Sequence, residues 1–205
     1  AIIPLRAWSE PSKNLLRYIP APNVGDSTFS TSSHGKILRD DKASFRVDGN
    51  HPRWGLISAY YFFDDYNLDN PYPTGQGGAS VPGFAALNLG RSQLINLGQT
   101  KTFGASMVNE LRLSYMRSAN NVGQPSGGVG PSLASQGFAA GGNSGIVPLA
   151  PEIEGIENVT FNSFTIGTPI TNLTQANNTF ALIDNFSKVL GSHSLKAGVQ
   201  LSYEQ

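Results

Sequence analysis

The sequence contains no cysteine, little charge and no long apolar run, and each absence excludes a class of protein. Without cysteine among its 205 residues, the chain cannot form a disulfide framework, a thiolate zinc site or a cysteine nucleophile. Charged residues make up 14% of the chain and sum to a formal net charge of +0, so no broad basic surface exists to hold nucleic acid by its phosphates. No apolar stretch approaches the roughly 18 residues of a membrane helix. We therefore expect no nucleic-acid partner and no membrane crossing by helices.

Glycine, proline and aromatic residues are prominent instead. The chain has 23 Gly, 13 Pro, 7 Tyr and 11 Phe, and aromatic residues amount to 10% of it. Aromatic residues favour pleated strands, and Gly and Pro favour the turns between them. A length of 205 residues suits one domain. We therefore expect an all-β fold.

Three pairs of segments alternate apolar and polar residues with the period of two that indicates β-strands. The predicted hairpins occupy about 42–63, 91–117 and 179–203, with turns near 49–52, 104–106 and 191–193. The last segment, residues 194–203, alternates most cleanly. The segment from 91 to 103 is less regular, because Gln99 and Lys101 share a face with Ile95 and Leu97, which weakens the prediction of its register.

Long stretches without a strong pattern lie between the hairpins. Residues 64–90 and 119–176 are rich in Gly, Pro and Asn, and residues 1–41 form an irregular connector in which 12–18 are compatible with a short helix. Short turns that alternate with long loops are typical of a bacterial outer-membrane barrel, with turns in the periplasm and loops outside the cell. We predict an antiparallel up-and-down meander of about six strands, a partial β-barrel over residues 42–205. A soluble β-sandwich is the alternative that this pattern leaves open.

Several short motifs resemble the barrel of TonB-dependent receptors of the Oar-like group, which carry a carboxypeptidase-regulatory-like domain. They occur in the family's order and cover most of the chain. The motifs are Ile19-Pro20-Ala21-Pro22-Asn23, Arg39-Asp40-Asp41-Lys42-Ala43-Ser44-Phe45-Arg46-Val47-Asp48, Asn70-Pro71-Tyr72-Pro73, Lys101-Thr102-Phe103, Val108-Asn109-Glu110-Leu111-Arg112-Leu113-Ser114-Tyr115 and Gly191-Ser192-His193-Ser194-Leu195-Lys196-Ala197-Gly198.

This resemblance implies both a fold and a function. Such receptors have an N-terminal regulatory-like domain, a plug and a closed barrel of about 22 strands, and they import substrates with energy relayed by TonB. The implied partners are outer-membrane lipid, the plug and the other barrel strands, TonB through the parent protein, and an unknown extracellular substrate. The sequence shows no signal peptide, plug, TonB-contacting segment or closing strand, so we expect an internal piece of such a receptor or a gene fragment.

The alternation divides the strand side chains into two predicted sets. The lumen-facing set is Arg46, Asp48, Glu110, Arg112, Lys196 and Gln200. The lipid-facing set is Leu111, Leu113, Tyr115, Leu195, Val199, Leu201 and Tyr203. Ionisable groups are tolerated in a watery interior, whereas Arg or Lys on the lipid face at mid-bilayer costs about 2 to 4 kcal/mol. Aromatic residues of the predicted outer loops could stack on a substrate, namely Tyr66, Tyr72, Phe84 and Phe138.

Other residue clusters give weaker indications of chemistry. Three histidines lie in predicted loops or turns, without the spacing of a metal site: His34, His51 and His193. One acidic loop segment could offer oxygens to calcium, but its spacing is not that of an EF-hand: Asp64, Asp65, Asp69 and Asn70. The Gly-rich segments near 127–130 and 141–145 lack the lysine of a phosphate-binding loop, and Ser144 lacks a nucleophile elbow. We expect no metal, no cofactor and no catalytic residue.

The leading hypothesis is a segment of a TonB-dependent outer-membrane receptor without enzymatic activity. A secreted β-sandwich that binds carbohydrate or protein is the second hypothesis, and an all-β hydrolase that uses a carboxylate of residues 64–69 is the third. An open six-stranded sheet leaves two unpaired edges and a bare apolar face, so we expect the chain to aggregate or oligomerise in water.

Overall fold

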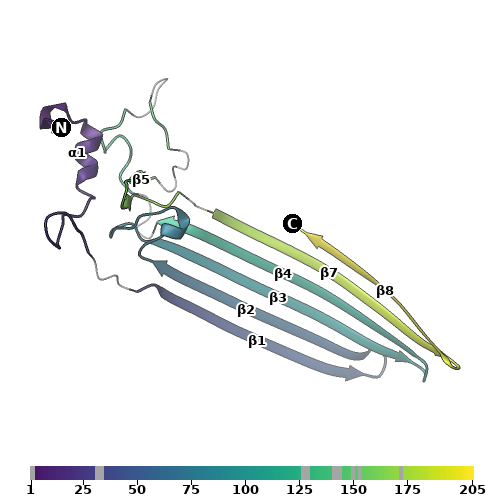
Figure 1. Ribbon diagram of the computed structural model, residues 1–205. Helices are drawn as coiled ribbons and strands as arrows, with labels where there is room; N and C mark the ends of the chain where they lie inside the picture. The colour runs from purple at the N-terminus through teal and green to yellow at the C-terminus, as the bar shows by residue number, and fades with distance from the viewer. Residues whose placement is uncertain are drawn as a thin grey trace. The chain divides into compact units, whose positions relative to one another are not determined.

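The computed structural model describes residues 3–30, 35–125, 130–139, 145–148, 151, 154–170 and 173–205, with only the backbone described at 124 and 125 (Figure 1). The chain divides into two compact units. The sheet unit comprises Arg39–Tyr66, Leu89–Asn120 and Thr174–Gln205. The loop unit comprises Ala1–Leu38, Asn67–Asn88 and Asn121–Leu173.

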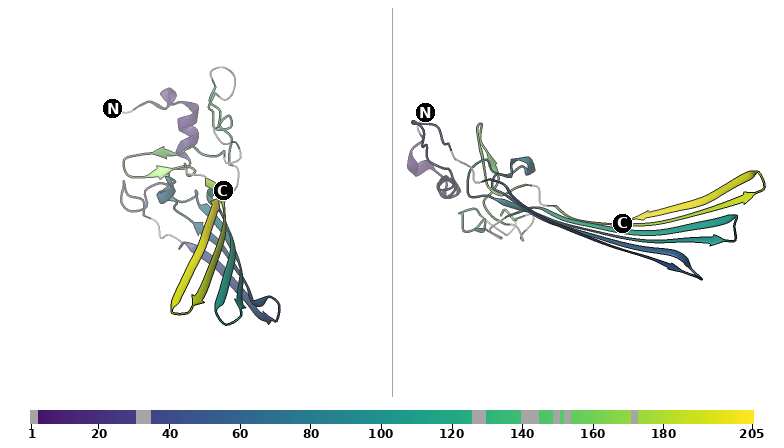
Figure 2. Two further views of the ribbon diagram at one scale, coloured as in Figure 1. Left: turned by 90° about the vertical axis from the view of Figure 1, so that its right-hand side faces the viewer. Right: turned by 90° about the horizontal axis from the view of Figure 1, so that it is seen from below.

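Six long strands form one antiparallel sheet in the order β1-β2-β3-β4-β7-β8. The strands are β1 (Ile37–His51), β2 (Gly55–Asn70), β3 (Ala86–Phe103), β4 (Met107–Pro125), β7 (Leu173–Leu190) and β8 (His193–Glu204). Each strand lies beside the one that precedes it in the sheet order, and the short turns gather at one end of the sheet (Figure 1). The sheet is open, with β1 and β8 at its edges, and it is twisted and curved (Figure 2). The predicted all-β meander of about six strands is confirmed.

Glycines with positive φ shape the three short turns. Gly104 has a φ of 64° and Gly191 a φ of 57°, and both lie in turns that the sequence predicts. The first turn lies later than predicted, because β1 continues to His51 and β2 begins at Gly55. Gly55 has a φ of 78°, and a Cβ there would lie 2.4 Å from the carbonyl oxygen of Thr100. Glycine is thus required at that position on two grounds, conformation and space.

The strands are longer than their alternating parts, so the connections are shorter than predicted. β2 continues to Asn70 through a segment whose composition suggests a loop. Its two adjacent aspartates have basic neighbours on the flanking strands: Asp64 lies 3.8 Å from Lys42, and Asp65 lies 3.1 Å from Arg91. Cross-strand ion pairs of this kind allow a polar segment to remain in a sheet.

The register of the last hairpin divides its residues between two faces. Phe180 lies opposite Tyr203 and Leu182 opposite Leu201, whereas Ala181 and Ile183 lie opposite the polar Ser202 and Gln200. Successive side chains of a strand point to opposite faces. The sheet therefore has an apolar face, which carries Leu201 and Tyr203, and a polar face.

Glycines on the inner strands allow close side-chain approach between β2 and β3. A Cβ at Gly90 would lie 2.0 Å from the ring of Tyr66, and one at Gly98 would lie 2.5 Å from the hydroxyl of Ser58. The ring of Tyr66 thus occupies the space above Gly90, and its hydroxyl donates to Asn120 on β4 at 3.4 Å. This packing ties three successive strands together.

The loop unit has a small core of its own. It contains the 3-10 helices Leu5–Ala7 and Thr74–Gln76, the helix α1 (Glu10–Leu16) and the hairpin of β5 (Val159–Thr160) and β6 (Thr165–Ile166). The buried cluster consists of Ala79, Val81, Phe84, Ile156 and Ile166, with Leu15, Tyr18, Ile19, Val159 and Phe164 packed against it. The core thus joins segments from three distant parts of the chain, including residues predicted to be a connector. Within the described residues, neither α1 nor a 3-10 helix is long and apolar enough to cross a membrane.

Glu157 is a buried carboxyl group in the loop unit. Both of its carboxyl oxygens are buried without a hydrogen-bond partner among the described residues. Burial raises the pKa of this carboxyl above its ordinary value, and the nearby Glu154 raises it further.

Substitution at Gly90 tests the packing under Tyr66. We expect Gly90→Ala to lower the free energy of unfolding by about 1 to 3 kcal/mol, because the added methyl group overlaps the ring. Gly49→Ala in β1 is the matched control, since a Cβ there meets nothing within 4 Å. Denaturant unfolding in detergent measures both. Equal effects at the two positions would contradict the proposed role of the ring, and Tyr66→Ala should rescue Gly90→Ala.

The pH dependence of the loop unit tests the state of Glu157. A raised pKa in the folded state means that stability is greatest below the ordinary glutamate pKa and falls as pH rises through the folded pKa. Glu157→Gln should remove this fall and stabilise the unit at neutral pH. Hydrogen exchange at amides near Ile166, corrected for the intrinsic effect of pH, measures the change. Glu10→Gln, which removes only an exposed ion pair with Lys13, should change little; unaltered protection in Glu157→Gln would refute the assignment.

Candidate functional site

A polar groove lies on one face of the sheet. Its volume is about 750 Å³, and its lining comes from β1, β2, β3, β4 and β7. Its polar side chains lie beside apolar ones such as Leu56 and Ile183, and they include Arg46, Ser58, Asn96, Thr100 and Arg112. Such a surface suits water or a polar partner, because its hydrogen-bonding groups would be costly to cover with lipid.

Charges on this face are partly compensated along the strands. The guanidinium of Arg46 donates to both carboxylate oxygens of Asp48, at 2.8 and 2.9 Å. Lys42 donates to Asp40 at 2.5 Å and lies 3.8 Å from Asp64 on the next strand. These exposed pairs contribute little to stability, but they leave the polar face without a strong field of one sign.

The predicted lumen-facing residues occupy different parts of the sheet. Arg46 and Arg112 border the polar groove, and Glu110 is half-buried two residues before Arg112. Lys196 and Gln200 are exposed on the edge strand β8, opposite Ser187 and Ile183 of β7. The strands thus bring Arg46 and Arg112 to one groove, while Lys196 and Gln200 lie apart from it.

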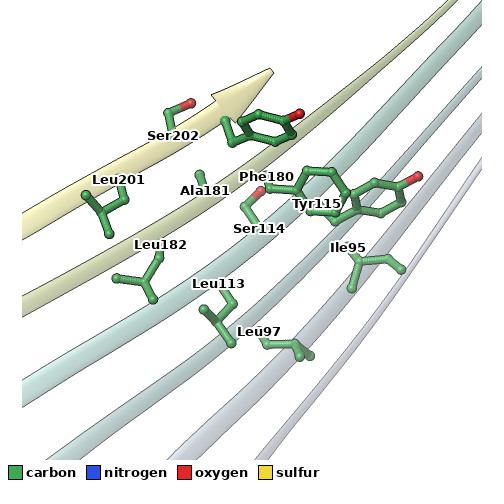
Figure 3. A pocket seen from close by; sticks show the side chains of 11 residues that line it. Ile95, Leu97, Leu113, Ser114, Tyr115, Phe180, Ala181, Leu182, Leu201 and Ser202 are labelled. Carbon is green, nitrogen blue, oxygen red and sulfur yellow. The ribbon is translucent and has the colours of Figure 1, made fainter. Parts of the chain in front are cut away.

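The opposite face of the sheet carries an apolar groove of about 400 Å³. Figure 3 shows its lining side chains on neighbouring strands, with Leu97 from β3, Leu113 from β4, Leu182 from β7 and Leu201 from β8. Ile95 lies in the same groove. The register of the third predicted strand, which the sequence defined poorly, therefore places its aliphatic residues on the apolar face.

The predicted lipid-facing residues lie on this face, but only some of them line the apolar groove. Leu113, Tyr115, Leu201 and Tyr203 line the apolar groove. The remaining members of the set are Leu111, half-buried on β4, and Leu195 and Val199 on β8, which are 55% and 49% exposed.

A polar pair interrupts the apolar face towards its short turns. Val199 lies opposite Asp184, whose carboxylate accepts a hydrogen bond from the amide of Asn109 at 2.7 Å. Sequence reasoning did not find this pair, because Asn109 and Asp184 lie 75 positions apart in the chain. It also assigned no role to Phe180 and Leu182, although the alternation between residues 178 and 182 would have indicated their face.

The four predicted loop aromatics differ in their environments. Tyr66 belongs to β2, and its ring covers Gly90. Phe84 is 8% exposed in the core of the loop unit, where its ring lies 6.1 Å from that of Tyr18, so packing occupies it. Tyr72 and Phe138 are half-buried.

A second apolar groove lies in the loop unit and was missed by sequence reasoning. Its volume is about 550 Å³, and it is lined by residues 3–19 of the N-terminal segment together with Val159 and Phe161. Trp8 contributes an indole ring, and Phe161 stacks on Phe164 at 4.5 Å between ring centroids. The composition of the first 41 residues gave no signal for this groove, because contacts with β5 create it.

Metal chemistry has no evident site in the described part of the chain, where no three His, Asp or Glu residues come close enough to hold an ion. His51 ends β1 and accepts a hydrogen bond from the backbone of Arg53, and His193 begins β8. Of the acidic segment considered for calcium, Asp64 and Asp65 interact with cations on different strands. His34, Ser144 and the glycine pairs at 127–128 and 141–142 lie outside the described residues.

Comparison with known proteins agrees with this two-faced sheet. The family model described as "Outer membrane beta barrel domain" matches residues 1–205, which is the whole chain. No curated protein and no solved structure gave a match. The match places the protein in the bacterial outer membrane and explains why one face of its sheet is apolar and exposed. The chain belongs to the outer membrane beta barrel domain family.

Proposed function

We propose that the chain is a segment of a TonB-dependent receptor barrel of the Oar-like group, and that its parent imports an extracellular substrate without a chemical step of its own. The sequence motifs resemble that group, and the family match supports the barrel. The observation that carries the proposal is the polar groove on the face opposite the apolar one. A lumen lined in this way can hold water, a plug or a passing solute.

The polar groove suits an interior partner better than lipid. Arg112 borders the groove and lies within 4.0 Å of no carboxylate in the described part of the chain. A plug segment or a substrate with acceptor oxygens could hydrogen-bond to its guanidinium. Among the predicted loop aromatics, Tyr66, Tyr72 and Phe138 retain exposed surface, but the ring of Tyr66 packs over Gly90. Tyr72 and Phe138 remain the candidates for contact with substrate.

The alternative of a secreted β-sandwich requires a second sheet over the apolar face. Leu195, Val199 and Leu201 are 55%, 49% and 60% exposed, so no described segment covers them. For the hydrolase, Asp64 and Asp65 of the segment considered for catalysis each interact with a basic residue on a different flanking strand. Uptake by a membrane barrel therefore accounts best for the two faces.

Dependence on TonB tests the receptor proposal. Formaldehyde cross-linking in living cells should give an adduct of the natural protein with TonB, detected by blotting against both proteins. Cells that lack TonB are the control and should show no adduct. If a resident TonB-dependent receptor gives its adduct in the same cells and this protein gives none, the receptor proposal is wrong, although the barrel assignment stands.

Two adjacent substitutions on opposite faces test the lipid contact. Leu201→Arg should lower the free energy of unfolding of vesicle-inserted protein by about 2 kcal/mol. This is the lower end of the cost of an arginine at mid-bilayer, because Leu201 lies two residues from Tyr203, which is suited to the membrane interface. Gln200→Arg should change it by less than about 0.5 kcal/mol, since its side chain points to the polar face. Guanidinium titration of the two variants measures the difference. Equal costs would mean that Leu201 does not meet lipid.

A further inference from the structure

Three aromatic rings border the apolar groove at its end away from the short turns. The ring centroids of Tyr115 and Phe180 lie 4.9 Å apart, and those of Phe180 and Tyr203 lie 6.3 Å apart. The rings come from β4, β7 and β8 and line the same groove as Leu113, Leu182 and Leu201, and Figure 3 shows those of Tyr115 and Phe180. The groove is therefore aliphatic at one end and aromatic at the other. In outer-membrane barrels, aliphatic side chains face the bilayer core and aromatic side chains lie at the interface, so the aromatic end corresponds to the interface.

Arg117 lies on the same face, just beyond these rings. Its guanidinium and the hydroxyl of Tyr115 both donate to the side-chain oxygen of Asn178, each at 2.9 Å. Arg39 and Arg91 each form an ion pair with an aspartate, whereas Arg117 has no carboxylate within 4.0 Å among the described residues. The amide of Asn178 positions the guanidinium without neutralising its charge.

The position of Arg117 along β4 corresponds to the outer edge of the membrane. It follows the start of the strand at Met107 by about ten residues, which is about 33 Å of strand at about 3.3 Å per residue. At a barrel tilt of about 40°, this becomes about 25 Å along the membrane normal, the usual height of the apolar band. The part beyond the polar Asn109, about 20 Å, is the apolar part of this span. Because Met107 follows a short turn, the direction from Met107 to Arg117 leads from the periplasmic side to the outer leaflet.

We propose that Arg117 and the apolar groove form a binding site for a phosphate-bearing lipid of the outer leaflet. An acyl chain packs on the apolar surface formed by Leu113, Leu182 and Leu201, and the phosphate accepts hydrogen bonds from Arg117. The charge selects this occupant, because an apolar protein surface in the groove would bury an unneutralised guanidinium beside it at a cost of several kcal/mol. A zwitterionic lipid would fill the groove but would bring its own cation close to Arg117. The site depends on the lipid-facing orientation of the sheet and not on the receptor proposal.

Fluorescence quenching by brominated lipids tests the site in vesicles. The two native tryptophans are replaced by Trp8→Phe and Trp54→Phe, and Tyr203→Trp places a single reporter beside the groove. The chain is inserted into phosphatidylcholine vesicles that contain either brominated phosphatidylglycerol or brominated phosphatidylcholine as the probe. We expect the anionic probe to be enriched at the reporter by about fivefold, the effect of one basic residue near a membrane surface.

Three variants of the reporter protein separate a site from general attraction. The preference is the enrichment of the anionic probe over the zwitterionic probe at the reporter. Arg117→Gln should reduce this ratio to about one, and Arg117→Lys should retain most of it. Arg112→Gln removes the same charge from the same strand but from the opposite face, and it should leave the preference unchanged. Protease protection confirms insertion of each variant. Equal quenching by the two probes, an unchanged preference in Arg117→Gln, or equal losses in Arg117→Gln and Arg112→Gln would each overturn the proposal.

Discussion

A single sheet with a different solvent on each face is the constraint on which this structure depends. Every backbone N–H and C=O at membrane depth must be paired, which the sheet ladder achieves for the four inner strands, while the side chains alternate between lipid and a polar interior. A slip of one residue in the register would exchange the two sets. The pairing of Phe180 with Tyr203, and of Ile183 with Gln200, is therefore a condition for residence in the membrane and not merely a detail of β7 and β8.

The side-chain packing between strands supports that register. The ring of Tyr66 fills the space above Gly90, and the hydroxyl of Ser58 approaches Gly98, so both contacts of β2 with β3 need a glycine on the facing strand. On the other face, Asn109 and Asp184 join β4 to β7. Each contact is specific for its two positions and would be lost in a shifted pairing. These local interactions therefore reinforce the register that the alternation of apolar and polar side chains favours.

The parts of the fold that local alternation determines could be predicted from the sequence. The segment from 194 to 203 alternates cleanly because both of its faces are in contact with a uniform environment, and β8 occupies His193–Glu204. The C-terminal end of β2 was missed, because Asp64 and Asp65 look like loop residues unless their partners Lys42 and Arg91 are known. The face of β7 was left unassigned for a related reason, since Asp184 breaks the apolar pattern and has its partner on β4.

The loop unit shows the limit of such reasoning more clearly. Its core joins Tyr18 to Phe84, and the side-chain amide of Asn158 donates to the backbone of Gly77 at 2.7 Å. Contacts between residues so far apart in the chain produce no periodic pattern in the sequence, so the N-terminal segment looked like a connector. The aromatic residues that sequence reasoning assigned to substrate illustrate the same point, because composition alone could not distinguish the buried Phe84 from the half-buried Phe138.

The Asn109–Asp184 pair also limits the thickness of bilayer that the protein can match. Between Asn109 and Arg117, β4 presents Leu111, Leu113 and Tyr115 to the hydrocarbon, a stretch of about 26 Å of strand or about 20 Å along the normal at a tilt of about 40°. A bilayer of average thickness, about 30 Å of hydrocarbon, would have to thin around such a surface, whereas the bacterial outer membrane is already thinner than average. Hydrophobic mismatch would then favour retention of this sheet in the thinner of the two bacterial membranes.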